Sequence, residues 1–374
     1  MIGRPTRRLL FRVLAGACAV ASPVLSFTAP VKKIGLSLPL TGGQSEVAID
    51  LLAGYKLGCA AGGSGIQVEV LDDLSSPEKT AANIGRLCGD PDVVAVSGVV
   101  GTPHAQASIP VARAAEVPMV GIRSGALFLR DGKPGVYHLR ASFEDEISKV
   151  LDFLRGALFT ELVVVYSNDS FGKSSLDHLV KRAALLGINV RFSQAVDREG
   201  GGLPAACDGA AAAIRSAKTA VAVYLLLIAK PMEQAVGLLR STHKIVYPIF
   251  TMSFIGTRSI STNNDPKFIG LGMATAFPLP RGNDRLAMQF RRDATKFNAG
   301  DVYESLSAFE GYFYATVISN ALRSASSVDR VGLSRSLGRG LSVSQNQIEF
   351  DKSVVGFHYL DLVRKNSFNF RFSS

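Results

Sequence analysis

Residues 93–123 read VVAVSGVVGTPHAQASIPVARAAEVPMVGIR, and this stretch decides the fold that the sequence predicts. Residues 93–100 are a continuous apolar run rich in valine, which is typical of a strand covered on both faces of a parallel sheet. Gly101 breaks the run. Thr102 and Pro103 are typical of a helix start, with Thr102 as N-cap and Pro103 at the first helical position. We expect the helix over about residues 104–115 and a second buried strand at residues 117–122, which makes a strand–turn–helix–strand unit.

The turn at Gly101 is a candidate binding site for an anion. A helix start at the carboxyl edge of a parallel sheet presents backbone N–H groups and the positive end of the helix dipole, and α/β folds bind small molecules at this edge. A carboxylate would suit the position. Alternatively, Thr102 only caps its helix, and the Thr-Pro pair does not decide between the two.

Strands and helices alternate along the rest of the chain. This alternation predicts an α/β fold with doubly wound parallel sheets, and 374 residues are enough for two domains. We expect further strands at residues 33–38, 67–71, 161–166, 189–192, 220–228 and 248–252. Helices are expected after residue 280, followed by short strands with a hairpin near Lys365 and Asn366.

Residues 1–29 have the pattern of a secretory signal peptide. Four arginines precede an apolar stretch at about residues 13–25, which is too short for a confident membrane span. The arginine pair loosely resembles a twin-arginine signal, and Cys18 leaves lipidation open. No later segment has about 18 consecutive apolar residues, so a soluble periplasmic protein is expected after cleavage.

The charge pattern argues against nucleic acid as a partner. The chain carries a formal charge of +10. Because residues 1–29 contain four arginines and no acid, the mature protein is near +6 (10 − 4). Its basic residues are scattered, with no aromatic residues interleaved. No zinc-ligand spacing and no hydrolase, metalloprotease or Walker motif is present, so we expect no metal, no cofactor and no catalytic residue.

Three cysteines remain after cleavage. Cys59 and Cys88 fall near the ends of the first two predicted helices, so a disulfide between them is expected in an oxidising compartment, with Cys207 left free. The alternative is three buried, reduced thiols.

Seven segments in order resemble the type I periplasmic solute-binding proteins of ABC importers, in the branched-chain amino acid-binding branch. They are IGLSLPLTGG, VEVLDD, the Cys59/Cys88 spacing, VSGVVGTPHAQASIPVARAAEVPMVGIRSGA, YHLRASFEDE, ELVVVYSNDSFG and YESLSAFEGYFYA. The resemblance implies two lobes joined by three crossings, with a solute in the cleft and a hinge motion that closes it. Lobe 1 would be residues 30–140 plus 277–343, and lobe 2 residues 141–276 plus 344–374.

The resemblance also implies which residues of lobe 1 bind the solute. The carboxylate grip of the family corresponds to Gly101, Thr102 and Pro103. The next contact set corresponds to Arg123, Ser124 and Gly125, where amino acid binders offer a carbonyl and a hydroxyl to the ligand amine. Arg123 departs from that pattern, because a cation repels an ammonium group. It could favour a second anionic group, or it could point away into a salt bridge.

In lobe 2 the resemblance places Phe171 as an aromatic wall, then Leu227 or Ile228, then Ser253 and Phe254. Amino acid binders commonly have an acidic residue in that last turn, and residues 252–256 contain none. Glu46 could reach the cleft or be exposed, and Glu310 is expected to be structural.

These features together predict a monomeric solute receptor that is not an enzyme. It would bind a small anionic or zwitterionic solute, either an amino acid or an aromatic or aliphatic acid, and deliver it to an ABC permease in the inner membrane. One alternative is a sensor of the same fold that acts on a signalling partner. Another is an enzyme that uses Asp72, Asp73 and His104, although no nucleophile with a positioned base is visible.

Overall fold

The computed structural model of the protein describes residues 31–255, 258–300, 302–344, 346–350, 356–357, 359–365 and 370–372. The expected signal peptide and Cys18 lie outside these ranges. Within them, no helix is both long and apolar enough to cross a membrane.

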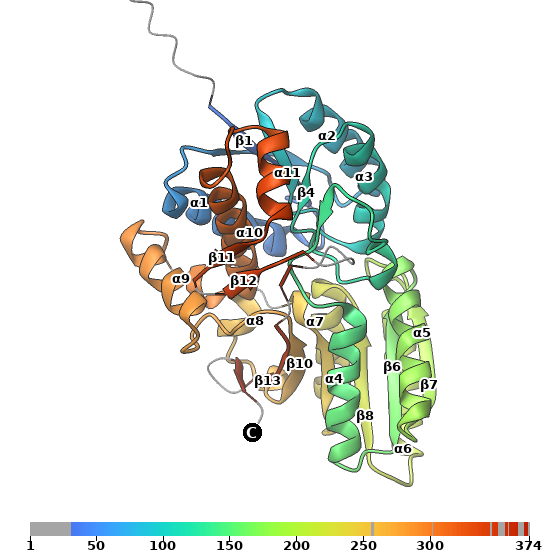
Figure 1. The fold of residues 1–374 in the computed structure, drawn as a ribbon. Coiled ribbons are helices and arrows are strands. Elements are labelled where there is room, and N and C mark those ends of the chain that lie inside the picture. The colour runs from blue at the N-terminus through green and yellow to red at the C-terminus, as the bar shows by residue number, and fades with distance from the viewer. Residues whose placement is uncertain are drawn as a thin grey trace, which may run out of the picture. The chain divides into compact units, whose positions relative to one another are not determined.

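The first sheet is parallel throughout and has the strand order β2-β1-β3-β4-β5. Its strands are short and mostly buried, and each is separated from the next by a crossover, as the alternating sequence predicts (Figure 1). The bounds are β1 Lys33–Leu38, β2 Gln67–Asp72, β3 Val93–Ser97, β4 Met119–Val120 and β5 Val136–Tyr137. The first three helices are α1 Ser45–Gly62, α2 Pro77–Gly89 and α3 Thr102–Ala114.

Three late helices return to the first sheet. They are α9 Arg285–Lys296, α10 Leu306–Arg323 and α11 Arg330–Gly338. Helix α10 packs along α1 over its length (Figure 1). Glycines permit this close approach: a Cβ atom on Gly54 would lie 1.9 Å from the Ala308 carbonyl oxygen, and one on Gly58 would lie 2.6 Å from that of Tyr312. The helix that packs on α1 therefore lies about 250 residues further along the chain than α1 itself.

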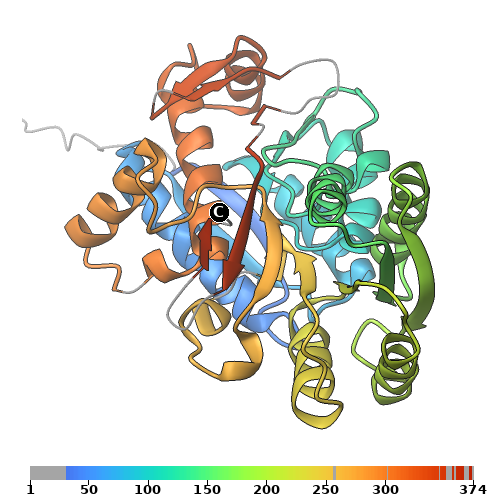
Figure 2. The same ribbon diagram turned by 90° about the horizontal axis from the view of Figure 1, so that it is seen from below.

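The second sheet has the order β14-β13-β10-β9-β8-β6-β7. Strands β6 to β10 are parallel to one another. Strand β13 runs antiparallel to β10 and to β14, and Figure 2 shows it in red beside the orange strand of this sheet. The strands are β6 Glu161–Ser167, β7 Asn189–Val196, β8 Val221–Leu226, β9 Ile249–Met252, β10 Leu271–Thr275, β13 Asp361–Lys365 and β14 Phe370–Phe372. The helices that follow its strands or lead into it are α4 Phe143–Gly156, α5 Ser170–Leu185, α6 Leu203–Arg215, α7 Ala229–Gly237 and α8 Arg258–Thr262.

The α/β fold class predicted from the sequence is confirmed, and the chain passes between the two sheets three times. The passages follow β5, β10 and the hairpin of β11 Leu341–Val343 with β12 Asn346–Ile348. Val343 and Ile348 pack in the same hydrophobic cluster as α10. This hairpin spans the crossing expected at residues 343–344, and the division into lobes stays a prediction.

The expected disulfide between Cys59 and Cys88 is not formed. Both residues, like Cys207, are free and buried thiols. Cys59 belongs to the hydrophobic cluster that contains α10, and Cys88 belongs to the other cluster, with α3. Helix α1 links β1 to β2, whereas α2 links β2 to β3 on the other side of β1. Right-handed crossovers therefore place the two helices on opposite faces of the sheet, and the two cysteines do not meet.

One helix start differs from the prediction. Ser76, a typical capping residue before Pro77, caps α2 and accepts a hydrogen bond from the Lys79 N–H at 3.3 Å. At α3, however, the N-cap is Gly101 and Thr102 is the first helical residue. Gly101 has φ +105° and ψ 149°, a conformation that only glycine adopts readily. The Thr102 hydroxyl therefore does not cap the helix.

Candidate functional site

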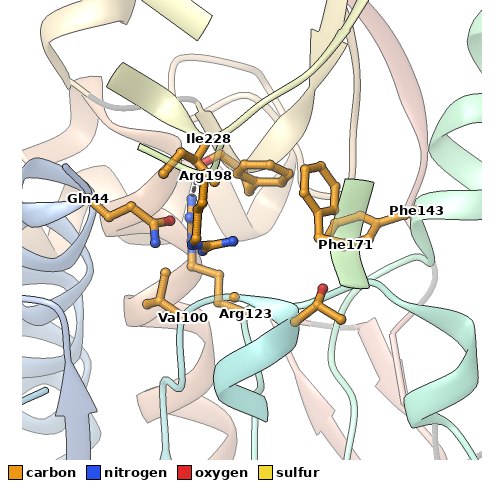
Figure 3. A pocket seen from close by; sticks show the side chains of 10 residues that line it. Gln44, Val100, Arg123, Phe143, Phe171, Arg198 and Ile228 are labelled. Atoms are coloured by element: carbon orange, nitrogen blue, oxygen red, sulfur yellow. Dashed lines mark hydrogen bonds between the residues drawn. The ribbon is translucent and has the colours of Figure 1, made fainter. Parts of the chain in front are cut away.

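A pocket lies where the carboxyl ends of the strands of both sheets meet (Figure 3). The pocket is narrow, with an empty volume of about 270 Å³ that includes space open to solvent. The walls therefore lie close together. The residues that line it are Gln44, Val100, Gly101, Thr102, Arg123, Phe143, Phe171, Arg198, Ile228 and Phe254.

The lining residues lie mostly in turns that follow the carboxyl ends of the strands. Gln44 precedes α1, Val100, Gly101 and Thr102 connect β3 to α3, and Arg123 follows β4. From the second sheet, Phe171 follows β6, Arg198 follows β7, Ile228 follows β8 and Phe254 follows β9, while Phe143 starts α4. Parallel sheets bring such turns to one edge, which is why α/β folds bind ligands there. The pocket thus needs both sheets.

Three phenylalanines form one wall of the pocket. The ring centres of Phe143 and Phe171 lie 5.1 Å apart at 68°, and those of Phe171 and Phe254 lie 5.1 Å apart at 83°. Phe143 and Phe254 close the triangle at 5.7 Å. Edge-to-face contacts of this kind hold rings in fixed orientations. The wall is apolar and suits an aromatic or aliphatic group.

Arg123 lines the pocket, but its guanidinium is bound by the protein. Nε donates to Glu310 at 2.9 Å, and Nη2 donates to the Phe254 carbonyl at 2.7 Å and to Ser307 at 2.8 Å. Of the two roles left open for Arg123, the structure shows the salt bridge. Burial lowers the pKa of Arg123, and the Glu310 carboxylate opposes that shift.

Arg140 extends this arrangement into a buried network of two cations and two anions. Its guanidinium donates to Glu310 at 3.0 Å, to Glu146 at 2.9 Å and to the Ser253 hydroxyl at 2.7 Å. Burial works to lower the pKa of Arg140, but Glu310 and Glu146 together more than offset it and raise that pKa. Glu310 is therefore structural, as expected, and Ser253 belongs to this network rather than to the pocket lining.

Arg198 is the second cation of the pocket. Its Nη1 donates to the carboxylate of Asp169, which also caps α5 by accepting from the Gly172 N–H at 2.9 Å. Nε and Nη2 of Arg198 are buried, and neither has a hydrogen-bond partner among the described residues. Arg198 was not among the residues expected from the sequence.

Hydroxyl and amide groups complete the polar side of the pocket. The Thr102 hydroxyl lies 2.9 Å from the Ser124 hydroxyl, and both side chains are buried. Gln44 is 3% exposed, and its Nε2 has no hydrogen-bond partner in the part of the chain that the structure describes. In Figure 3 the Gln44 amide and the Arg198 guanidinium lie together, on the opposite side from Phe143 and Phe171.

The structure brings five of the ten expected ligand residues into the pocket lining: Gly101, Thr102, Arg123, Phe171 and Phe254. Ile228 lines it in place of Leu227, which is buried beside it. Ser124 contacts Thr102 from behind, and the Gly125 carbonyl accepts from the Phe143 N–H at 2.9 Å. Pro103 is the second residue of α3. The binding role of all ten stays a prediction.

Sequence reasoning missed Gln44, Val100, Phe143 and Arg198. Gln44 follows a Gly-Gly turn and Phe143 opens a helix after a capping serine, so a systematic survey of every strand-to-helix turn would have included both. Arg198 lies in the DREGGG segment after β7, which reads as a solvated turn. Only its burial against Gly101 distinguishes it.

The three residues considered as possible catalytic groups, Asp72, Asp73 and His104, have structural surroundings instead. Asp73 accepts hydrogen bonds from the hydroxyls of Ser37 at 3.3 Å and Thr80 at 3.1 Å, and burial raises its pKa to about 6. Asp72 accepts from the Leu40 N–H at 3.0 Å. His104 is buried near Arg198, and burial, with that cation, lowers the pKa of His104 to about 4.

The chain matches the family model described as periplasmic binding protein over residues 32–346. No curated protein matches it by sequence. Among solved structures, it is similar to a substrate-binding periplasmic protein from Ralstonia solanacearum, with 24% identity, a TM-score of 0.82 and coverage of 91% of this chain and 100% of that chain.

Two further solved structures carry ligand information in their names. A leucine-binding protein from Thermotoga maritima has 18% identity and a TM-score of 0.78, over 92% of this chain and 98% of that chain. A solute-binding protein of an ABC transporter from R. palustris, in complex with benzoate, has 15% identity and a TM-score of 0.79, over 92% and 95%. At these identities the likeness concerns the fold. The family model, which covers most of the sequence, shows that the chain belongs to the periplasmic binding protein family, and its fold is of type I.

Proposed function

We propose that the protein is the extracytoplasmic solute-binding receptor of an ABC importer and that it binds a small carboxylate-bearing solute in the pocket between the two sheets. The observation that carries the proposal is the pocket lining, in which the described residues include two arginines and a wall of three phenylalanines but no acidic side chain. A concave apolar site with a few convergent polar groups is the usual form of a small-molecule site.

The similar structures support the same solute class. Leucine and benzoate, named with two of them, differ in size and shape, but both carry a carboxylate. In this chain the carboxylate would lie at the start of α3, where the Thr102 hydroxyl and the positive end of the helix dipole favour an anion. The apolar body of the solute would lie against Phe143, Phe171 and Phe254.

The proposal includes a closing motion and a partner. Residues 30–140 plus 277–343 would form one lobe, and residues 141–276 plus 344–374 the other, after export directed by residues 1–29. Closure around the solute by a hinge motion would create the surface that an inner-membrane permease recognises. The protein would act as a monomer in the periplasm.

A thermal-shift and calorimetry screen tests the proposal on the mature chain. The probes are benzoate, 3,4-dihydroxybenzoate, leucine and succinate, with glucose as a solute that lacks a carboxylate. At 100 times its Kd, a ligand that binds only the folded state adds about 2.7 kcal/mol to the free energy of unfolding, which raises Tm. We expect at least one carboxylate to do so. A response to glucose with none to any acid would contradict the proposal.

The transport role needs a separate measurement. Deleting the gene should reduce cellular uptake of the radiolabelled acid that binds best, and restoring the gene should recover it. Uptake that is unchanged by the deletion would favour a sensor that shares the fold.

A further inference from the structure

The guanidinium of Arg198 has one occupied end and one open edge. Nη1 is paired with Asp169, whereas Nε and Nη2 are buried without a hydrogen-bond partner among the described residues. Nε and Nη2 lie side by side on the planar group and donate in parallel, which is the geometry that binds both oxygens of a carboxylate. Buried donors without partners are costly in a protein interior, so this edge requires an explanation.

The open edge faces the pocket. A Cβ atom on Gly101 would lie 2.9 Å from Nη2 of Arg198, which places the guanidinium directly against the turn that starts α3. The Gln44 amide, 97% buried and with its Nε2 unpartnered in the described chain, lies beside it (Figure 3). Two independent sets of buried donors from different elements therefore converge on one part of the same pocket.

Three carboxylates near the pocket are already engaged by the protein. Glu310 is bound by Arg123 and Arg140, and Glu146 by Arg140 and Ser253. Asp169, the acid closest to the open edge, is held by Arg198 and by the Gly172 N–H. A ligand ammonium group bound at the open edge would thus lose its water beside the Arg198 cation, with the neighbouring Asp169 already paired, which is unfavourable.

We infer that Arg198 is a specificity-determining residue, which binds the solute carboxylate through Nε and Nη2, with Gln44 beside it, and excludes solutes that carry an α-ammonium group. The inference rests on the proposed function and narrows its solute class. The solute is a carboxylic acid without an amine, and its aromatic or aliphatic body packs on the three phenylalanines.

Matched pairs of probes test the exclusion on the unmodified mature chain. Phenylalanine is compared with 3-phenylpropanoate, and leucine with 4-methylpentanoate, since each pair differs only by the α-ammonium group. Calorimetry should give at least about tenfold tighter binding of the amine-free member. The reason is that an ammonium group beside the Arg198 cation costs more binding free energy than one hydrogen bond contributes. An amino acid that binds as tightly as its amine-free partner would overturn the inference.

The variant Arg198→Gln tests the residue itself. Binding of benzoate and of the amine-free probes should weaken about 10- to 100-fold. The preference against amino acids should shrink, since Asp169 loses its cation and can accept an ammonium group. Arg198→Lys keeps the charge but not the paired donors, so its affinity for these acids should lie between that of the unmodified chain and that of Arg198→Gln.

Arg191→Gln is the matched control. Arg191 lies on β7, the strand that Arg198 follows, and like Arg198 it pairs with an acid, at 2.6 Å from Glu161. It is 24% exposed against 17% for Arg198, and it does not line the pocket. Ligand affinity should be unchanged in this variant, whatever its effect on Tm.

The outcomes separate the inference from the proposed function. If the unmodified chain binds no carboxylate, the proposed function fails. If it binds carboxylates and Arg198→Gln binds them within twofold of the unmodified chain, the inference alone fails. Should Arg198→Gln not fold, as judged by circular dichroism, Arg198→Lys carries the same test with a threshold of threefold.

Discussion

Two arginines in one pocket differ in what surrounds their guanidinium groups. Arg123 is enclosed by Glu310, Ser307 and the Phe254 carbonyl, so its charge stabilises the protein. Arg198 has one anionic partner and an open edge toward the pocket. The residue type is the same, and only the neighbours decide which cation is available to a solute.

Thr102 is the residue whose hydroxyl we expect to contact the solute. In Thr102→Ala the affinity for the best-binding acid should fall by about 1–3 kcal/mol, because a charge-assisted hydrogen bond is lost. Calorimetry of the purified variant measures this. Thr316→Ala is the control, since the Thr316 hydroxyl donates to the Tyr312 carbonyl within α10 and does not line the pocket. Unchanged affinity in Thr102→Ala would show that the carboxylate binds elsewhere.

The pair α1 and α10 shows how an element depends on small residues. Gly54 and Gly58 of α1 face α10, and Gly311 of α10 faces α1, where a Cβ would lie 2.2 Å from the Leu51 carbonyl oxygen. Glycine inside a helix costs about 0.5–1 kcal/mol relative to alanine. Here the closeness of the two backbones, and the burial of the apolar residues around them, outweighs that cost.

Gly54→Ala should therefore destabilise the protein, because the new methyl group would lie 1.9 Å from the Ala308 carbonyl oxygen and force the helices apart. We expect a loss of about 1–3 kcal/mol in the free energy of unfolding, typical of overpacking, measured by urea denaturation. In the control Gly85→Ala, within α2, the nearest atom is at 3.6 Å, so the higher helix propensity of alanine should leave stability equal or raised. Equal stability of Gly54→Ala would contradict the close packing.

At the scale of the whole molecule, the buried ionic network joins the two sheets. Arg123 follows β4 of the first sheet and donates to the Phe254 carbonyl, which follows β9 of the second. Arg140 contacts Glu310 of α10 on one side and Glu146 of α4 on the other. Two positive and two negative charges balance, which is required because an unpaired buried charge is strongly destabilising.

Removing one charge from the network should lower the free energy of unfolding. Glu310→Gln removes the anionic partner of Arg123 and leaves Arg140 with Glu146, so we expect a loss of about 3–5 kcal/mol in the free energy of unfolding. Urea denaturation measures it. Asp177→Asn is the comparison, because it breaks the exposed Lys181–Asp177 pair, which should change stability little. Similar losses in both variants would contradict a special role for the buried network.

Stability should also fall in mild acid. Burial lowers the pKa of His104 to about 4 and that of His138 to about 3, so both stay neutral in the folded state while the unfolded chain protonates them below pH 6.5. Asp73, whose pKa is raised to about 6, binds one proton in the folded state and opposes this. Counting these three groups alone, the unfolded chain binds about one more proton than the folded chain between pH 6 and 5. Their contribution should therefore raise the unfolding equilibrium constant about tenfold over that unit.

Urea denaturation at pH 7.5, 6.0 and 5.0 measures this dependence. In His138→Gln the unfolded chain loses one of its two extra protons, so the change between pH 6 and 5 should nearly vanish, even if the variant is less stable throughout. A slope that stays the same in His138→Gln would show that other groups cause the acid sensitivity.

The sequence by itself determined the local elements and their type. The valine-rich run before Gly101, the serine cap before Pro77 and the alternation of strand and helix patterns follow from short-range chemistry, so the α/β fold was predictable. For the same reason the turns after strands were recognisable as candidate site positions, and Gly101, Thr102, Arg123, Phe171 and Phe254 do line the pocket.

Only the tertiary structure decided which side chains meet. It kept Cys59 and Cys88 in separate hydrophobic clusters, enclosed Arg123 with Glu310 from 187 residues further along the chain, and placed Arg198 of an unremarkable polar turn against Gly101. Hydrogen bonds and ion pairs act over a few ångströms in space, not along the sequence. The availability of a charge in this pocket therefore depends on long-range packing that no local pattern records.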